Sequence, residues 1–329
     1  MTAGLVLLVV VGALFVVPSN EYIFLPDRAH PVGPLVFVAG GKDPAGPGGI
    51  YFVDVIVRKA TLLERLFGGL HRGADLEAPD NVVPPGITNA QNDQLSFEEM
   101  RTSQQIAGAV ALRSLGYKVK AVGNGARVDS IEPGLPAEGK LEPTDVIVAV
   151  DGKAVTSPIS LTKAMHGRPA GQTVRFTIHR GSKTLTVSIR TVAASHTSKR
   201  AVVGIYVEQA ESIHLPIRVS IDAGNVGGPS AGLAFALDVL EKLGHNVDHG
   251  NKIAATGEIF LNGAVGPIGG IKQKTYGARE AGVDAFLVPA GQNATDAKRY
   301  AHGLRIIPVK SFQQALHALA TLPVKSSAA

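Results

Sequence analysis

The sequence contains no cysteine and no tryptophan, and only 5% of its residues are aromatic. Without cysteine the chain has no disulfide framework, no thiolate nucleophile and no cysteine-based metal site. Neither a Gly-x-x-x-x-Gly-Lys-Ser/Thr phosphate loop nor a His-Glu-x-x-His zinc motif occurs in the 329 residues. We therefore expect no P-loop ATPase in this sequence, and no metal or other cofactor. Lysine and arginine are scattered and the net charge is only +5, so nucleic acid is not an expected partner.

An apolar run covers residues 3–17 and ends before Pro18. It is shorter than the roughly 20 residues that a helix needs to cross the hydrocarbon core. No small-residue cleavage site follows it and no basic flank precedes it, which argues against a cleaved signal peptide. A buried helix or strand is the structural alternative. We expect a transmembrane signal anchor over residues 1–20, followed by a connector rich in proline and glycine over residues 21–48.

Two short motifs carry the chemistry. The first is Gly227–Gly232, a glycine-rich turn with Ser230 at the start of an apolar helical run. Backbone N–H groups at such a helix start are unused by helical carbonyls and can hold an oxyanion. The second is Gly269–Lys274, where a lysine desolvated in an apolar pocket can accept a proton from serine. Taken alone, the first motif also fits an ordinary helix N-cap, and most lysines are solvated.

Together the motifs resemble the proteolytic domain of Lon, a Ser–Lys dyad protease of peptidase family S16. Three segments carry the resemblance, in the family's order and near its spacing: Gly228–Gly232, Thr256–Ile259 and Val265–Lys274. The resemblance implies that Ser230 is the nucleophile and Lys274 the general base. It gives a supporting role to Thr256, and to Gly228, Pro229 and Ala231 around the serine.

Two neighbouring positions need comment. Lys272 is expected to be a solvated neighbour of the dyad, because the family's base is the second lysine of the motif. Gly227 stands where Lon proteins often have an acidic residue. Either the dyad works without that carboxylate, or substrate alignment differs.

The segment before the serine motif fits the same family. A strand is predicted from Gly49 to Val57, and a long helix from an N-cap at Ser96 to Gly116. We assign residues 49–116 to the first part of the protease domain and residues 200–323 to its second part. Strands alternate with helices in the second part, which indicates an α+β fold with helices packed against a mixed sheet.

We predict an inserted, mostly β module over residues 117–195. Arg127–Ala137 followed by Leu141–Gly152 resembles a bacterial PDZ domain, a module that binds an extended peptide beside a sheet edge. The predicted strands are Lys118–Val122, Arg127–Ile131, Val146–Val150, Val174–His179 and Thr184–Ile189, with one helix over Ser160–Met165. The resemblance implies peptide-binding residues at Leu115, Gly116 and Tyr117 and on the helix at Leu161 and Met165. The module is alternatively a spacer or an intramolecular lid.

The whole sequence resembles the membrane-anchored, PDZ-containing Lon-like proteases of bacteria, whose soluble part lies outside the cytoplasm. This implies an ATP-independent serine endopeptidase at the cell membrane that cleaves unfolded or membrane-tethered proteins. It also implies a homo-oligomer, such as a hexameric ring. Two alternatives stay open: a non-catalytic PDZ scaffold on an inactive Lon-like fold, and a small-molecule kinase with a phosphate at the serine turn.

Overall fold

The computed structural model describes residues 11–44, 46–84, 87–194 and 200–325. The chain forms two compact units, residues 1–118 with 215–329, and residues 119–214. The second unit therefore interrupts the first along the sequence. It ends at His214 rather than near residue 195, because strand β14 (Ile205–His214) pairs along its length with β7 (Lys120–Ile131).

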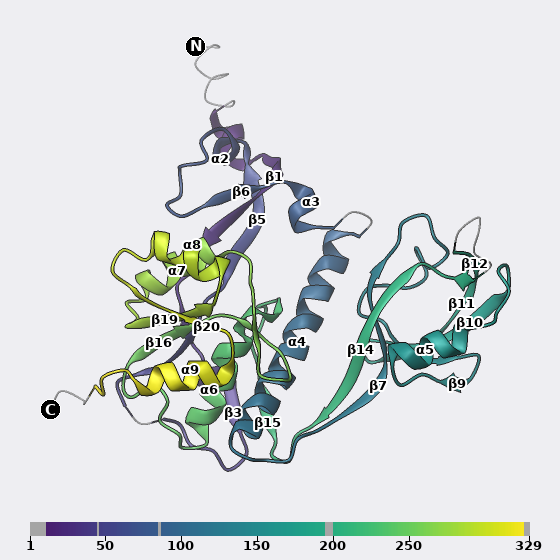
Figure 1. The fold of residues 1–329 in the computed structure, drawn as a ribbon. Coiled ribbons are helices and arrows are strands. Elements are labelled where there is room, and N and C mark those ends of the chain that lie inside the picture. The colour runs from purple at the N-terminus through teal and green to yellow at the C-terminus, as the bar shows by residue number, and fades with distance from the viewer. Residues whose placement is uncertain (1–10, 45, 85–86, 195–199, 326–329) are drawn as a thin grey trace, which may run out of the picture. The chain divides into compact units, whose positions relative to one another are not determined.

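The first unit is built on a five-stranded sheet (Figure 1). In spatial order its strands are β2 (His30–Pro31), β4 (Gly49–Phe52), β16 (Lys252–Ala255), β19 (Ala285–Pro289) and β20 (Arg305–Val309). The last four are parallel, and β2 pairs antiparallel with β4. Every residue of β19 is buried, as expected for a parallel strand with helices over both faces of its sheet.

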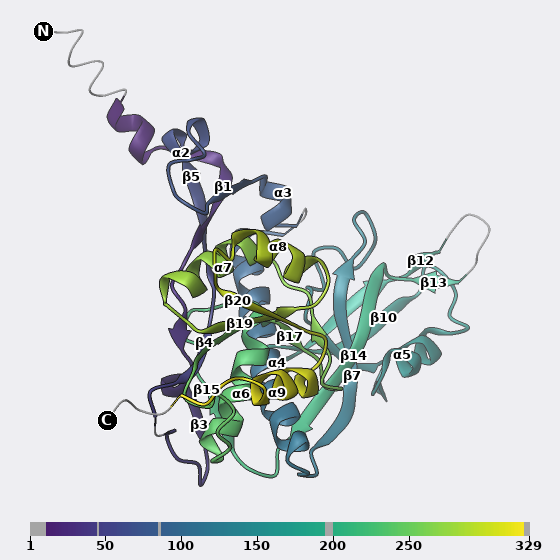
Figure 2. The same ribbon diagram turned by 60° about the vertical axis from the view of Figure 1, so that its left-hand side comes forward.

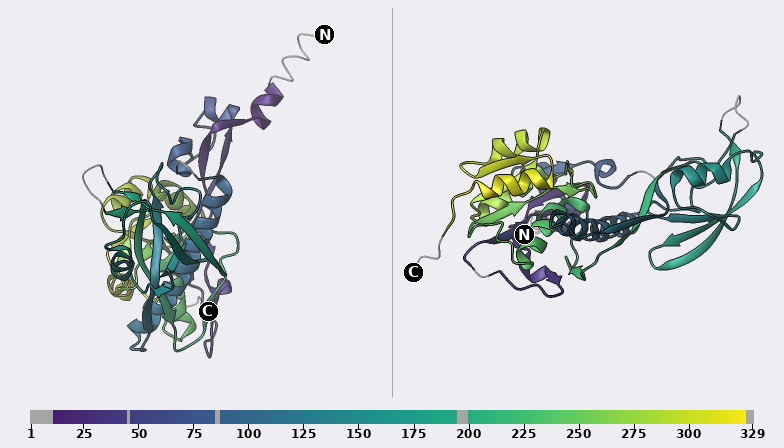
Figure 3. Two further views of the ribbon diagram at one scale, coloured as in Figure 1. Left: turned by 90° about the vertical axis from the view of Figure 1, so that its right-hand side faces the viewer. Right: turned by 60° about the horizontal axis from the view of Figure 1, so that its bottom comes forward.

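Five helices cover the two faces: α4 (Asn89–Ser114), α6 (Gly232–Lys242), α7 (Ile271–Glu280), α8 (Gln292–Tyr300) and α9 (Phe312–Ala320). Successive residues of a strand point to opposite faces. Ile253 and Ala255 accordingly pack in an apolar cluster with α4, α6 and α9, whereas Ala254 packs with α7 and α8. Figures 2 and 3 show these layers from other sides. The helices α6 and α7 thus lie on opposite faces of the sheet.

A second sheet, which we call the N-terminal sheet, has the order β5-β1-β6 and is antiparallel. Its strands are β1 (Pro18–Pro26), β5 (Val55–Thr61) and β6 (Asp75–Glu77), and the short helices α2 (Leu62–Leu66) and α3 (Pro79–Val82) follow β5 and β6. The expected connector over residues 21–48 is therefore largely structured. Besides β1 and β2 it contains η1 (Gly33–Leu35) and β3 (Val36–Val38), which pairs with β15 (Val219–Ile221).

Part of the expected membrane anchor, residues 1–10, falls outside the described residues. Residues 11–16 are helical, and Pro18 to Asn20 begin β1 instead of continuing an anchor. In the part of the chain that the structure describes, no helix combines the length and the apolar character that crossing a membrane requires.

Helix α4 begins before the predicted cap at Ser96. Thr88 is its N-cap, and a capping box joins the side chains of Thr88 and Gln91 to each other's backbone N–H groups. Ser96 consequently lies inside the helix, where its carbonyl accepts a hydrogen bond from the Gly228 N–H at 2.8 Å. The early start lets the helix reach the serine turn.

The second unit is a mostly β module with one helix. Its sheet has the order β11-β10-β8-β7-β14, with β9 paired to β8. The remaining elements are β8 (Val146–Val150), β9 (Lys153–Ala154), α5 (Pro158–Met165), β10 (Thr173–Arg180), β11 (Lys183–Arg190), β12 (Val192–Ala193) and β13 (Ala201–Val202). The predicted strands Val146–Val150, Val174–His179 and Thr184–Ile189 fall within β8, β10 and β11. Arg127–Ile131 and the last three residues of Lys118–Val122 belong to the single long strand β7. The sheet and α5 enclose a core that includes Ile147 and Phe176.

Candidate active site

The glycine-rich turn places Ser230 in one 3-10 turn, η2 (Pro229–Ala231), which leads into α6. Gly228 precedes this turn with a φ of 79°, a left-handed conformation that glycine adopts without strain. Pro229 occupies the first helical position, where its missing N–H leaves no helical carbonyl unpaired. Ser103 of α4 fixes the turn from the side, since its hydroxyl donates to the Pro229 carbonyl at 2.9 Å.

Helix α6 carries the serine turn into the core. All 11 of its residues are buried, in agreement with the apolar run from Leu233 to Leu243. The Phe235 ring lies 6.2 Å from the ring of Phe52 in β4. A helix packed on all sides leaves little freedom to the turn at its start, so the backbone of Ser230 is held in place.

Lys274 reaches the serine from the other face of the sheet. It lies in the first turn of α7, whose N-cap Gly270 has a φ of 66°. The residue is only 4% exposed, and its Nζ donates a hydrogen bond to Ser230 Oγ at 2.5 Å. The two predicted catalytic residues therefore meet directly.

Thr256 joins the serine turn to the lysine. It follows β16 at the carboxyl end of that parallel strand, where sites of α/β sheets commonly form. Its hydroxyl donates to the Ser230 carbonyl at 3.1 Å and accepts from Lys274 Nζ at 3.4 Å. The N–H of Gly257 donates to the same Ser230 carbonyl at 2.8 Å. These contacts fix the backbone of Ser230 at the end of the strand.

Burial determines how readily the Lys274 amine is protonated. Desolvation lowers the pKa of Lys274 to about 8 from 10.5, and the Asp54 carboxylate acts in the opposite direction. Neutral lysine is therefore available at mildly alkaline pH, as a general base requires.

Comparisons with known proteins agree with this geometry. A family model described as the Lon protease (S16) C-terminal proteolytic domain matches residues 160–321, and a PDZ domain model matches residues 114–191. Lon protease of Azorhizobium caulinodans is 31% identical over 184 residues, which cover 54% of this chain and 21% of that protein. Lon protease 2 of Bacillus subtilis is 36% identical over 111 residues, covering 34% of this chain and 19% of that protein. This chain thus spans about a fifth of the length of these relatives.

The chain therefore combines a region similar to the Lon (S16) proteolytic domain with a region similar to PDZ domains. The two family models overlap over residues 160–191, which the structure assigns to the second, PDZ unit. Among solved structures, the PDZ domain of an SdrC-like protein from Listeria monocytogenes is 26% identical, covers 26% of this chain and 87% of that chain, and has a TM-score of 0.24.

Close packing disfavours a side chain at the glycine before the Gly-Pro-Ser motif. A Cβ at Gly227 would lie 2.4 Å from Ser96 Oγ and 3.0 Å from Ser96 Cβ. Rotation of the Ser96 hydroxyl can relieve the first contact, but the second remains tight. The close approach of α4 therefore favours glycine at this position over an acidic residue.

Asp54 is a carboxylate near the dyad that the sequence did not single out. It lies between β4 and β5, and its charge acts on Lys274. Its Oδ1 is buried without a hydrogen-bond partner among the described residues, and burial raises the pKa of its carboxyl. In the sequence, Asp54 could have been noticed as an acidic residue inside the apolar stretch from Ile50 to Val57.

Lys272 is not the solvated neighbour that we expected. Its Nζ donates to Asp75 Oδ1 at 2.6 Å and to the Ala74 carbonyl at 3.0 Å, and its side chain is 24% exposed. The ion pair joins α7 to the N-terminal sheet.

The residues predicted to bind peptide in the PDZ module lie in both units. Leu115 and Gly116 follow α4 in the first unit, where Leu115 packs against the core and the Tyr117 N–H donates to the Leu112 carbonyl. Leu161 is buried in the core of the second unit and Met165 packs against that core. The side chains of Leu115, Leu161 and Met165 therefore contribute to the cores of their own units.

Possible metal ligands gather at one place among the described residues. Atoms of Asp27, His30 and Asp54 lie within 4.8 Å of one another. His30 Nε2 pairs with Asp27 Oδ2 at 3.3 Å, and the His30 side chain is 46% exposed. This pairing accounts for the arrangement, and we assign no metal to it.

Proposed function

We propose that this protein is a serine endopeptidase in which Ser230 attacks the scissile carbonyl and Lys274 is the general base. The observation that supports this most strongly is the 2.5 Å contact between Ser230 Oγ and the buried Lys274 Nζ. A hydroxyl bonded to a desolvated amine of pKa about 8 is the arrangement that activates serine without histidine.

The reaction begins with neutral Lys274. Its Nζ takes the Ser230 proton as Oγ forms a bond to the carbonyl carbon, and the protonated amine then gives that proton to the leaving nitrogen. The C–N bond breaks and leaves an acyl-enzyme. Lys274 next takes a proton from water as the water oxygen attacks the ester carbon. The protonated amine then returns that proton to Ser230 Oγ as the ester C–O bond breaks, which releases the second product and regenerates the dyad. The N–H groups of the first helical turn around Ser230 stabilise the oxyanion in both steps.

Cleavage is independent of ATP in this proposal, because the sequence has no phosphate loop. For ATP-independent cleavage, suitable substrates are proteins that are already unfolded or are tethered near the enzyme. The PDZ module recruits them or gates the site. Such modules bind extended peptides along a sheet edge.

The proposed location is the cell membrane, with both units outside the cytoplasm, and the proposed assembly is a homo-oligomer. The apolar run over residues 3–17 and the family resemblance support this location. Protease protection of the intact protein in spheroplasts tests it: both units should be digested from outside the cell, and protection would contradict the proposal.

The proposed activity is tested by cleavage of fluorescent casein, unfolded, with and without ATP. We expect wild-type protein to cleave it equally in both conditions, and Ser230→Ala to lose cleavage while circular dichroism shows an intact fold. Ser220→Ala is a matched control on strand β15, and should cleave as wild type does. Cleavage that survives Ser230→Ala would contradict the proposed nucleophile, and a folded wild type without any activity would favour the scaffold alternative.

A further inference from the structure

Helix α7, which carries Lys274, is held by all three strands of the N-terminal sheet or by residues next to them. A Cβ on Gly277 would lie 1.7 Å from the carbonyl oxygen of Asp27, the residue after β1, so the two backbones touch. At the start of the helix, a Cβ on Gly270 would lie 2.6 Å from Val55 Cγ2 in β5. The third contact comes from β6 and the residues before it.

The third contact centres on Asp75, the first residue of β6. One carboxylate oxygen accepts from Lys272 Nζ at 2.6 Å and the other accepts from Gln273 Nε2 at 2.9 Å. The carbonyls of Gly73 and Ala74 accept from the same two side chains, each at 3.0 Å. Four hydrogen bonds therefore fall on the two residues that immediately precede Lys274.

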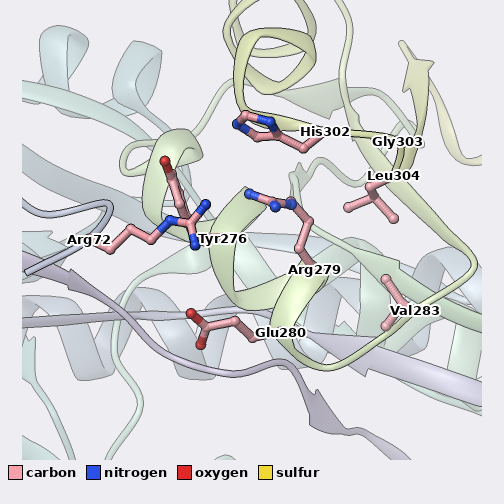
Figure 4. Close-up of a pocket in the computed structure, with 8 residues that line it drawn as sticks. All are labelled: Arg72, Tyr276, Arg279, Glu280, Val283, His302, Gly303 and Leu304. Carbon is pink, nitrogen blue, oxygen red and sulfur yellow. The ribbon is translucent and has the colours of Figure 1, made fainter.

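The residues before Asp75 extend this contact along the helix. Gly73 has a φ of 82°, and a Cβ there would lie 2.9 Å from the Tyr276 ring. The Arg72 guanidinium lies over that ring, 6.0 Å from its centroid. Figure 4 shows Arg72 beside Tyr276, with Arg279 of α7 nearby. Residues 72–75 thus line the first two turns of α7.

We propose that residues 72–75, with Asp75 at their centre, are a positioning element that fixes the first turn of α7 and so keeps Lys274 Nζ against Ser230 Oγ. Asp75 acts through Lys272 and Gln273 and touches no reacting atom. The proposal rests on the proposed function, because it assumes that Lys274 is the base.

The physical reason is that Lys274 is almost completely buried. Gln273 is 2% exposed and Lys274 is 4% exposed, so the first turn of α7 excludes water only while it stays closed. Loss of the Asp75 carboxylate leaves Lys272 and Gln273 with one backbone carbonyl acceptor each, and so removes half of the hydrogen bonds that hold that turn. Water then reaches Nζ and stabilises its protonated form. The charged groups around Lys274 in this change are Asp54, between β4 and β5, and Lys272 on α7 itself.

The test compares Asp75→Ala and Asp75→Asn with Asp284→Ala. Asp284 is a matched control because its carboxylate also accepts from one lysine, Lys325, and from one further N–H, that of Lys252, away from the dyad. Two quantities are measured in the full-length protein: amide hydrogen exchange of the peptide covering residues 271–280, and the pH dependence of kcat and KM.

For Asp75→Ala we expect faster exchange in α7, a fall in kcat of about tenfold with KM nearly unchanged, and a rising pH limb displaced upward by roughly one unit. Asp75→Asn keeps an acceptor for Gln273 and should give intermediate values, which also covers the case in which the alanine variant does not fold. The proposal would be overturned if Asp75→Ala matched Asp284→Ala in the amide exchange of α7, in kcat and in the position of the rising pH limb. Cleavage that survives Lys274→Ala would count against the proposed function, while the exchange data would still decide whether Asp75 holds α7.

Discussion

Ser230 Oγ and Lys274 Nζ lie 2.5 Å apart although their helices pack on opposite faces of the five-stranded sheet. They meet at Thr256, just beyond the end of β16. Neither helix alone determines this distance, because it depends on how both pack against the strand. The site is therefore sensitive to residues that position α6 and α7, as well as to the dyad itself.

Asp54 shifts the pKa of Lys274, and the direction of this shift can be measured. Its carboxylate favours protonated Lys274 and so raises the pKa of that lysine. Asp54→Asn removes this attraction, and neutral lysine then forms at lower pH. We expect the rising limb of kcat/KM to move to lower pH by on the order of half a unit. Asp284→Asn is the control and should leave the limb in place, and an upward shift for Asp54→Asn would contradict the assigned role.

The buried Lys274 should lower the free energy of unfolding at neutral pH. Its pKa is about 8 in the folded protein, against an ordinary value of 10.5, so the folded state binds the proton less tightly than the unfolded state. The free energy of unfolding of wild type should therefore rise with pH between these two values. Lys274→Met should be more stable than wild type at pH 7 by up to about 3 kcal/mol, and this gain should shrink towards pH 10.

Urea denaturation at pH 7 and pH 10 measures this difference. Lys272→Met is the matched control, because it removes a lysine that is paired with Asp75. It should leave stability unchanged or lower it. A Lys274→Met protein that is less stable than wild type at pH 7 would show that the dyad lysine does not carry the expected desolvation penalty.

Restoring an acid before the Gly-Pro-Ser motif should damage the enzyme. The Cβ of Gly227→Asp would collide with Ser96 Oγ and lie 3.0 Å from Ser96 Cβ. Relief requires rotation of the Ser96 hydroxyl and a small shift of α4 or of the serine turn. We expect a loss of at least about tenfold in kcat, since small displacements of reacting groups are costly. In Gly227→Ala, the second change Ser96→Gly should recover most of the activity. Gly227→Asp activity equal to wild type would contradict this explanation of the glycine.

The residues that meet at this site, Ser230, Lys274 and Thr256, could be singled out because each lies in a short motif that resembles the Lon proteolytic domain. Ser230 follows a Gly-Pro turn before an apolar run, and Lys274 opens a helix after two glycines. Their neighbours could not be predicted in this way. Asp75 pairs with a lysine 197 residues away, and only tertiary packing brings the two together.

The errors in element boundaries have physical causes as well. Strand β1 begins and ends with proline and pairs with distant segments, so its sequence resembled a connector. Helix α4 begins with a mostly polar segment from Asn89 to Gln94, so Ser96, which stands before acidic residues, looked like the cap. Leu161, predicted by resemblance to bind peptide, is buried in the small core of the second unit.

The most direct test of the dyad is the rate at which an acylating reagent modifies Ser230, followed by intact-protein mass spectrometry over a pH series. We predict a single modification, lost in Ser230→Ala, whose rate rises with pH through an apparent pKa of about 8. In Lys274→Ala this rise should disappear and the rate at pH 9 should fall by at least about a hundredfold. A rate that is the same in wild type and Lys274→Ala, or a modification on another residue, would contradict the assignment of Lys274 as the base of Ser230.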